Sequence, residues 1–107
     1  HSFITDIIDI ESNGAGYRKE SIIEVAIFRY DGHTITDQFI SLVNPESEIT
    51  PFVQKLTKIT SKMVKTAPRF HEIAKRIIEI TEGTTLVGHN IDFDYRMLRQ
   101  SFKRLGY

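Results

Sequence analysis

The sequence has no cysteine, no long apolar run and no excess of charge of either sign. Without cysteine the chain has no disulfides, zinc thiolate sites or thiol nucleophiles, so its fold must rest on packing. The 14 basic and 14 acidic residues cancel, so any site for a polyanion must be local. No apolar stretch approaches the roughly 18 residues of a membrane span, and the first residues lack the basic and apolar stretches of a signal peptide. We therefore expect a cytoplasmic protein in which residues 1–107 form one domain.

The first half of the sequence predicts three strands in an antiparallel meander. Residues 3–10 are rich in β-branched and aromatic side chains, and their apolar positions on both faces are typical of a strand buried within a sheet. Small residues at 12–16, including two glycines, should take the chain out of the sheet. Residues 22–30 form the second predicted strand, and the Asp-Gly pair that follows is typical of a hairpin turn. Residues 33–43 should then return antiparallel.

The second half begins with predicted helices. Thr50 followed by proline is typical of a helix start, and a short helix should run through Leu56, with another near Thr60. The clearest helix follows the Ala-Pro pair at 67–68 and ends at Gly83. Its apolar stripe is predicted to consist of Phe70, Ile73, Ala74, Ile77, Ile78 and Ile80.

A short buried strand and a final helix complete the predicted fold. The strand spans residues 84–87 and should lie parallel to the first, because helices connect it to the meander as a crossover requires. Asn90 or Asp92 should cap the final helix. The side chains of this helix that are predicted to pack inward are Phe93, Met97, Leu98 and Leu105. The sequence thus predicts an α/β fold with a mixed sheet.

Asp9 and Glu11 are two residues apart near the end of the first predicted strand. Their side chains therefore leave the same face of the strand, where they can share one site. Carboxylates are unfavourable in strands unless they are paired or bound to a metal ion. The pair is equally consistent with solvated charges at the exit of the strand, because aspartate before a turn is common.

A second acidic segment, residues 86–95, runs from the fourth predicted strand into the final helix and contains Asp92 and Asp94. Carboxylates in the first turn of a helix are favoured by the helix dipole by roughly 0.3–1 kcal/mol, which alone can account for both. However, the C-terminal ends of neighbouring parallel strands meet at one crevice, the usual ligand site of open α/β sheets. We predict that Asp94 meets Asp9 and Glu11 there. Three carboxylates would form a site suited to Mg²⁺ or Mn²⁺, ions that support phosphodiester hydrolysis without a side-chain nucleophile.

These segments resemble two motifs of a known family. Residues 9–14, Asp-Ile-Glu-Ser-Asn-Gly, resemble the Asp-x-Glu-Thr-Thr-Gly motif of the DEDD superfamily of 3′-to-5′ exonucleases, which includes the DNA polymerase III epsilon subunit and ribonuclease T. Residues 86–94 resemble the second motif, which ends in the third metal-binding aspartate. The resemblance spans nearly the whole chain, is strongest to epsilon-type domains of bacterial proteins, and implies a ribonuclease H-like fold.

The resemblance also implies a site and an activity. Asp9, Glu11 and Asp94 would be the catalytic residues and would bind two Mg²⁺ or Mn²⁺ ions, while Ser12 and Asn13 would contact the substrate. The implied reaction is two-metal hydrolysis of terminal phosphodiester bonds at the 3′ ends of DNA or RNA, in proofreading or repair, with a DNA polymerase or a fused domain as partner. The remaining polar residues of the second motif, namely His89, Asn90 and Asp92, would shape or cap the turn, and Phe93 would pack beneath the site.

The sequence departs from this family in three respects. Serine and asparagine replace the two threonines of the first motif, and Lys58 replaces a usual glycine; both changes would alter how the nucleotide is held. The third motif, a general-base histidine or tyrosine followed by a fourth aspartate, does not occur in the chain. We therefore expect a domain that is incomplete at its C-terminal end, with slow or no hydrolysis by these residues alone and activity in a longer parent protein. The fourth strand should then be an exposed edge that favours self-association.

Two other hypotheses are compatible with the sequence. The chain can be a catalytically inactive exonuclease-like module that binds a polymerase or nucleic acid, or an unrelated α/β domain on which Asp9, Glu11 and Asp94 are ordinary surface charges. DNA and RNA substrates are not separated by any residue. The final helix carries four basic residues that could meet phosphates, although a solvated helix face is the commoner outcome of such a pattern. They are Arg96, Arg99, Lys103 and Arg104.

Overall fold

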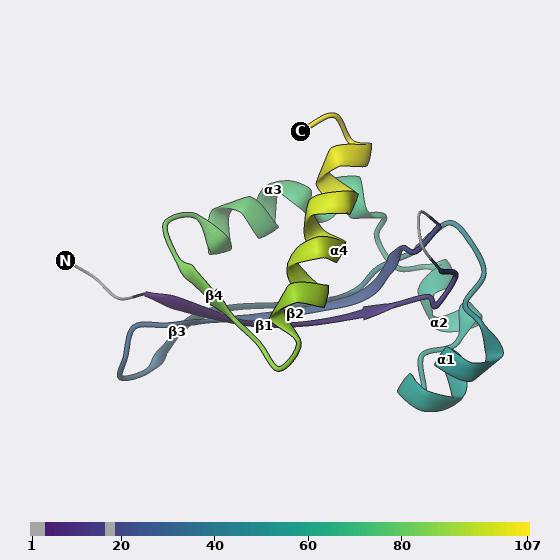
Figure 1. Cartoon of the computed structure of the whole chain (residues 1–107), viewed down its shortest axis with the longest axis horizontal. Coiled ribbons are helices and arrows are strands. Elements are labelled where there is room, and N and C mark those ends of the chain that lie inside the picture. Colours follow the sequence, from purple (N-terminus) through teal and green to yellow (C-terminus); the bar gives the residue numbers. More distant parts are fainter. Residues whose placement is uncertain (1–3, 17–18) are drawn as a thin grey trace.

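The fold is taken from a computed structural model, which describes residues 4–16 and 19–107. Four strands form one sheet in the order β3-β2-β1-β4 (Figure 1). Their bounds are β1 Thr5–Ser12, β2 Ile22–Tyr30, β3 Ile35–Leu42 and β4 Thr85–Val87. The predicted meander is confirmed, because β1 pairs antiparallel with β2, and β2 pairs antiparallel with β3. Phe3, which opened the first predicted strand, lies outside the described residues.

Four helices follow the meander, and each begins close to its predicted start. Their bounds are α1 Pro51–Thr57, α2 Ser61–Lys65, α3 Phe70–Thr81 and α4 Ile91–Arg104. The hydroxyl groups of Thr50 and Thr60 accept the backbone amides of Val53 and Met63, which satisfies donors that a helix N-terminus otherwise leaves free. None of the helices in the described part of the chain combines the length and apolarity that a membrane span requires.

The main core lies between one face of the sheet and the two longer helices. Helix α4 packs over β1 and β2, while α3 packs over β2 and β3, so both helices lie on the same side of the sheet (Figure 1). The buried residues of this core are Ile8, Ile10, Ile22, Val25, Ile27, Val43, Ile73, Ile77, Ile80, Met97 and Leu98. A smaller cluster, which α1 and α2 flank, lies at one end of the sheet and contains Ile23, Ile49, Ile59 and Val64.

The opposite face of the sheet is more open than the sequence predicted. Ile7 of β1 is 44% exposed and Val87 of β4 is 46% exposed, and these two residues are partners across the parallel pairing. The prediction of a first strand apolar and buried on both faces is therefore wrong for the face that carries Ile7. The prediction that β4 is buried is also wrong, because β4 is an edge strand with exposed ends.

Two residues of the predicted helical stripes also differ from expectation. Ile78 of α3 and Leu105 after α4 are both exposed, because α3 and α4 each contact the sheet with a narrower face than the apolar pattern suggested. The other apolar residues predicted for the two stripes are buried or partly buried against the main core.

Asp6 is a fully buried acid near the start of β1, and it does not line the acidic pocket of the predicted site. Its Oδ2 accepts the hydroxyl of Thr84 at 2.8 Å, but that hydroxyl lies equally close to the Thr81 carbonyl, and Asp6 Oδ1 has no hydrogen-bond partner. Burial raises the pKa of Asp6, although Thr84 and the nearby charge of Arg29 oppose the shift. Its charged form therefore destabilises the fold.

Replacing Asp6 with asparagine should stabilise the protein at neutral pH. Because the folded pKa is raised, the stability linked to Asp6 is complete below its unfolded pKa and is lost as pH rises through the folded pKa. We expect Asp6→Asn to add about 1 kcal/mol to the free energy of unfolding at pH 7–8, and to change it little near pH 3. Urea unfolding at both pH values measures this.

The control for this prediction is Asp37→Asn, for which the sign is reversed. The hydrogen bond from Arg76 lowers the pKa of Asp37, so its contribution is present above the unfolded pKa and is lost as pH falls. The Asp37 variant should therefore be less stable than the parent at neutral pH. If both substitutions changed the free energy of unfolding equally at pH 7–8, Asp6 would not be a destabilising buried charge.

Candidate active site

The pocket that contains the predicted site forms where β4 stops short of the end of β1. Strand β4 pairs with β1 only from Thr5 to Ile7, so the last residues of β1 have no strand on that side. The pocket beside them has a volume of about 270 Å³. Its lining consists of Asp9, Ile10, Glu11, His89, Asn90, Phe93 and Asp94. The structure therefore brings the three predicted carboxylates into one pocket.

Asp9 and Glu11 reach the pocket from the same face of β1. The alternation of the strand buries Ile8 and Ile10 against the helices, while Asp9 is exposed and Glu11 is half-buried on the other face. Glu11 lies directly opposite Glu24 of β2 in the antiparallel register. Like charges in that position repel, so the strand pairing alone does not explain these acids.

Asp94 enters the pocket from the first turn of α4, which a glycine allows to approach β1. A Cβ atom on Gly88 would lie 2.7 Å from the Ile8 carbonyl oxygen and 2.9 Å from Asp94 Oδ2. Both distances are too short for a side chain. Glycine at position 88 therefore lets the chain cross directly over β1, and this crossing places the buried Asp94 beside the strand.

Burial and neighbouring negative charges both disfavour the charged form of Glu11. Burial raises the pKa of Glu11 most, and the neighbouring charges of Asp9, Glu24 and Asp94 raise it further. Burial and Asp9 also raise the pKa of Asp94, while a hydrogen bond from the Ile10 backbone opposes that shift. A cation in the pocket would relieve each of these repulsions, so the donor set fits a hard divalent ion.

The carboxylates do not enclose an ion in their present side-chain positions. Within residues 4–16 and 19–107, no three His, Cys, Asp or Glu side chains are close enough together to hold a metal ion. Asp9 is exposed and Glu11 is half-buried, so both have room to turn toward an ion, whereas Asp94 is held against β1. The metal-ligand roles of the three residues therefore stay predictions that rest on their common pocket.

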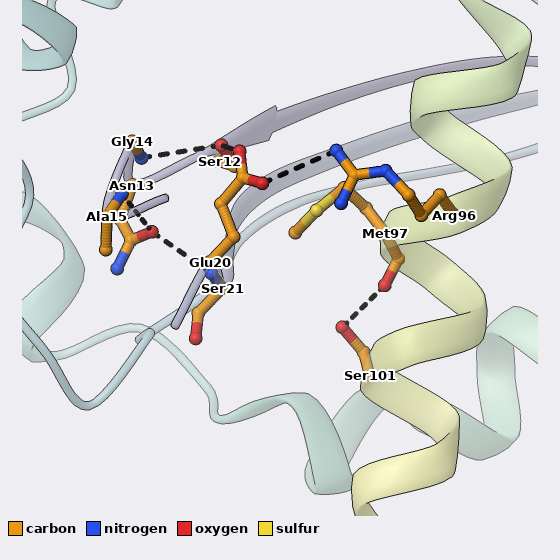
Figure 2. Close-up of polar contacts among 9 residues, drawn as sticks. All are labelled: Ser12, Asn13, Gly14, Ala15, Glu20, Ser21, Arg96, Met97 and Ser101. Atoms are coloured by element: carbon orange, nitrogen blue, oxygen red, sulfur yellow. Dashed lines mark hydrogen bonds and ion pairs between the residues drawn. The ribbon is translucent and has the colours of Figure 1, made fainter. Parts of the chain in front are cut away.

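The two predicted substrate residues that follow the acids differ in their surroundings. The Ser12 hydroxyl is half-buried and faces the loop before β2, where it donates to Glu20 Oε2 at 2.7 Å (Figure 2). The Asn13 side chain is fully buried. Its amide donates to Ser47 and Glu48 and accepts from the backbone of Ala15 and Ser21.

All four hydrogen-bonding positions of the Asn13 amide are therefore used within the protein. Asn13 joins the end of β1 to the start of β2 and to the loop before α1. The backbone N–H of Asn13 also donates to the Ser21 carbonyl, and its carbonyl accepts from the Thr50 amide. A substrate contact by Asn13 stays a prediction. The Ser12 hydroxyl accepts only the Gly14 amide, at 3.4 Å, so it keeps one free lone pair and is the better candidate.

Sequence reasoning did not predict how His89, Glu20 and Arg96 are placed at and near the pocket. His89, assigned to shaping the turn, lines the pocket with the acids. Glu20 and Arg96 form an ion pair at 3.4 Å that joins the loop before β2 to α4 (Figure 2). The adjacency of His89 to the second motif could have indicated its position, but nothing in the local sequence connects residues 20 and 96, which are 76 positions apart.

Comparison with known proteins places this geometry in a family. The family model described as Exonuclease, of the RNase T type, matches residues 7–107. The chain belongs to this exonuclease family. The resemblance to DEDD exonucleases and the ribonuclease H-like mixed sheet are thereby confirmed. The exonuclease family match includes both acidic segments of the pocket.

Individual relatives agree with the exonuclease family. The chain is 36% identical over 100 residues to a PolC-type DNA polymerase III of Caldanaerobacter subterraneus subsp. tengcongensis, covering 94% of this chain and 7% of the polymerase. It is 35% identical over 98 residues to the 3′-5′ exonuclease DinG of Staphylococcus saprophyticus, covering 92% of this chain and 11% of DinG. The chain thus spans about a tenth or less of the length of these relatives.

A solved structure shows the same fold. Exonuclease I of E. coli, crystallised with a dT13 oligonucleotide, superposes with a TM-score of 0.83 at 21% sequence identity, over 94% of this chain and 24% of that protein. A larger hollow of about 490 Å³ lies elsewhere on the present chain, between α3 and α4, but no acidic residue lines it. The acidic pocket, in contrast, gathers three carboxylates within the exonuclease-family fold, and its role as the active site stays a prediction.

Replacing Gly88 with alanine should disturb Asp94 selectively. The new methyl group would meet the Ile8 backbone, which cannot move away, and would displace the Asp94 carboxylate. We expect a loss of about 1–3 kcal/mol in the free energy of unfolding, the usual cost of overpacking. Urea unfolding and the amide resonances of residues 91–98 measure this, and an unchanged spectrum around Asp94 would contradict the described crossing.

Proposed function

We propose that this chain carries the catalytic carboxylates of a metal-dependent 3′-5′ exonuclease that hydrolyses terminal phosphodiester bonds of nucleic acid. The observation that carries the proposal is the meeting of Asp9, Glu11 and Asp94 in one pocket of an exonuclease-family fold. Residues far apart in the sequence reach this pocket from the end of β1 and from the first turn of α4. Surface charges on an unrelated domain would have no reason to converge in this way.

The chemistry of the pocket supports a two-metal reaction. Divalent ions, when bound, lower the pKa of a water nucleophile, hold the scissile phosphate and neutralise the leaving oxygen. The three carboxylates would supply oxygen ligands for these ions, and the unfavourable environment of Glu11 would become favourable beside a cation. Ser12, directly after Glu11, would contact the terminal nucleotide.

The relatives support DNA as a substrate and replication or repair as the setting. The two relatives described above are named as a DNA polymerase III and as a 3′-5′ exonuclease, and the E. coli structure holds an oligothymidylate. We propose single-stranded or 3′-terminal DNA as the substrate, within an epsilon-type proofreading or repair function. The partner would be a polymerase or a further domain of the same protein.

An inactive binding module is the alternative, and it is favoured by the open arrangement of the carboxylates. In that case the pocket would not need to bind Mn²⁺, and the acids could be replaced without loss of nucleic-acid binding. The two experiments below separate the alternatives, because one measures ion binding and the other measures hydrolysis.

Asp9→Asn and Asp94→Asn should each abolish most of the exonuclease activity of the full-length protein. Loss of an outer-shell partner of a metal site already costs roughly 10–100-fold, so loss of a ligand should cost about 100-fold or more in kcat. The measurement is the shortening of a 5′-labelled single-stranded oligonucleotide in Mn²⁺. The matched control is Asp92→Asn, an exposed acid in the same helical turn that does not line the pocket. Comparable losses of exonuclease activity in Asp92→Asn and Asp94→Asn would contradict the role of Asp94 as a metal ligand.

Mn²⁺ should stabilise the protein through Asp94. A ligand that binds only the folded state at 100 times its dissociation constant adds about 2.7 kcal/mol to the free energy of unfolding. We expect the Mn²⁺-dependent rise in melting temperature to disappear in Asp94→Asn and to persist in Asp92→Asn. Calorimetric titration with Mn²⁺ checks the same point directly, and equal Mn²⁺ affinity of the parent and Asp94→Asn would favour the inactive module.

A further inference from the structure

Glu20 joins the end of β1 to helix α4 beside the acidic pocket. One carboxylate oxygen of Glu20 accepts the Ser12 hydroxyl at 2.7 Å, and the other pairs with Arg96 at 3.4 Å (Figure 2). The Glu20 side chain is only 14% exposed. It therefore has two partners on two different elements, and both partners are neighbours of residues that line the pocket.

The hydrogen bond to Glu20 determines whether the Ser12 hydroxyl can act as a donor or an acceptor toward a ligand. A serine hydroxyl has one proton to donate and two lone pairs to accept with. The 2.7 Å distance is typical of a charge-assisted bond, so the proton is committed to the Glu20 carboxylate. The Gly14 amide donates to one lone pair of the Ser12 oxygen at 3.4 Å. Ser12 then presents its other lone pair, which can accept from a sugar hydroxyl but repels a phosphate oxygen.

The ion pair with Glu20 also sets the position of Arg96. The guanidinium carbon of Arg96 lies 5.4 Å from the centre of the Phe93 ring, and Phe93 lines the acidic pocket. The Arg96 side chain is 45% exposed and reaches from α4 toward the end of β1 (Figure 2). The ion pair thus holds an exposed cation beside a residue that lines the acidic pocket.

We propose that Glu20 is a positioning residue that gives the site its preference for a free 3′-hydroxyl end. By taking the Ser12 proton, Glu20 makes Ser12 an acceptor for the terminal hydroxyl of the nucleotide. By pairing with Arg96, it holds the guanidinium beside Phe93, where it attracts the phosphate backbone. The inference rests on the proposed exonuclease function and adds a determinant of end specificity to it.

The test compares oligonucleotides that end in a 3′-hydroxyl with otherwise identical ones that end in a 2′,3′-dideoxynucleotide. The full-length protein should cleave the hydroxyl end with the higher kcat/KM. In Glu20→Ala this preference should fall about three- to tenfold, the worth of one hydrogen bond, mainly through a rise in KM for the hydroxyl end. Ser12→Ala should lose the preference to the same extent, and Ser12→Thr, which keeps the hydroxyl, should retain it.

Two further variants separate the two partners of Glu20. In Glu20→Gln the amide oxygen can still accept the Ser12 proton, but the ion pair is lost, so the preference for the hydroxyl end should persist. Arg96→Ala should do the same, and both should raise KM for the two ends equally, by about two- to fivefold, as expected for an exposed ion pair. Glu79→Ala, which removes an exposed glutamate of α3, should change none of these quantities.

The outcomes distinguish this inference from the function on which it rests. If Glu20 only fastens the fold, Glu20→Ala will lower the active fraction, and so kcat, for both ends alike with KM unchanged, which overturns the inference. An unchanged preference in Glu20→Ala, in a protein whose cleavage still requires Asp9 and Asp94, overturns the role of Glu20 and leaves the exonuclease function intact. Cleavage that does not require Asp9 and Asp94 overturns both.

Discussion

Three parallel residue pairs between β1 and β4 determine where the acidic pocket lies. They join Thr5–Ile7 to Thr85–Val87 and then end, because Gly88 turns the chain over β1 instead of continuing along it. A longer β4 would pair with the end of β1 and fill the position that Asp94 now occupies. The pocket is therefore a consequence of a strand that stops early, and the start of α4 supplies a carboxylate where a strand partner is missing.

Local chemistry made most of the elements predictable. The strand Ile22–Tyr30 and the capped starts of α1 and α2 depend on side-chain alternation, turn residues and hydroxyl caps, which are all read within a few positions. The meeting of Asp9, Glu11 and Asp94 was also predictable, because it follows from parallel pairing and the period of a strand. Its chemical role came from the family resemblance and not from the spacing.

The features that escaped prediction depend on contacts between distant segments. The exposure of Ile7 could not be read from its apolar neighbours, because the pattern does not show that both longer helices pack on the same side of the sheet. The pair of Glu20 and Arg96 joins residues whose local surroundings indicate only solvated charges. The complete use of the Asn13 amide likewise depends on a loop more than thirty positions away.

The acids of β1 show how burial and convergence differ as signs of function. Asp6 is more deeply buried than Asp9 or Glu11, and one of its carboxylate oxygens has no hydrogen-bond partner, which is unfavourable for a buried charge. However, its side chain faces the main core and not the acidic pocket. Asp9 and Glu11 are better solvated but are joined by a third acid from another element, in a pocket open to solvent. A bound cation can offset the repulsion between carboxylates only where it can reach them. The accessible repulsion between Asp9, Glu11 and Asp94 therefore supports the proposed cation site, whereas the inaccessible charge of Asp6 indicates only a cost to the fold.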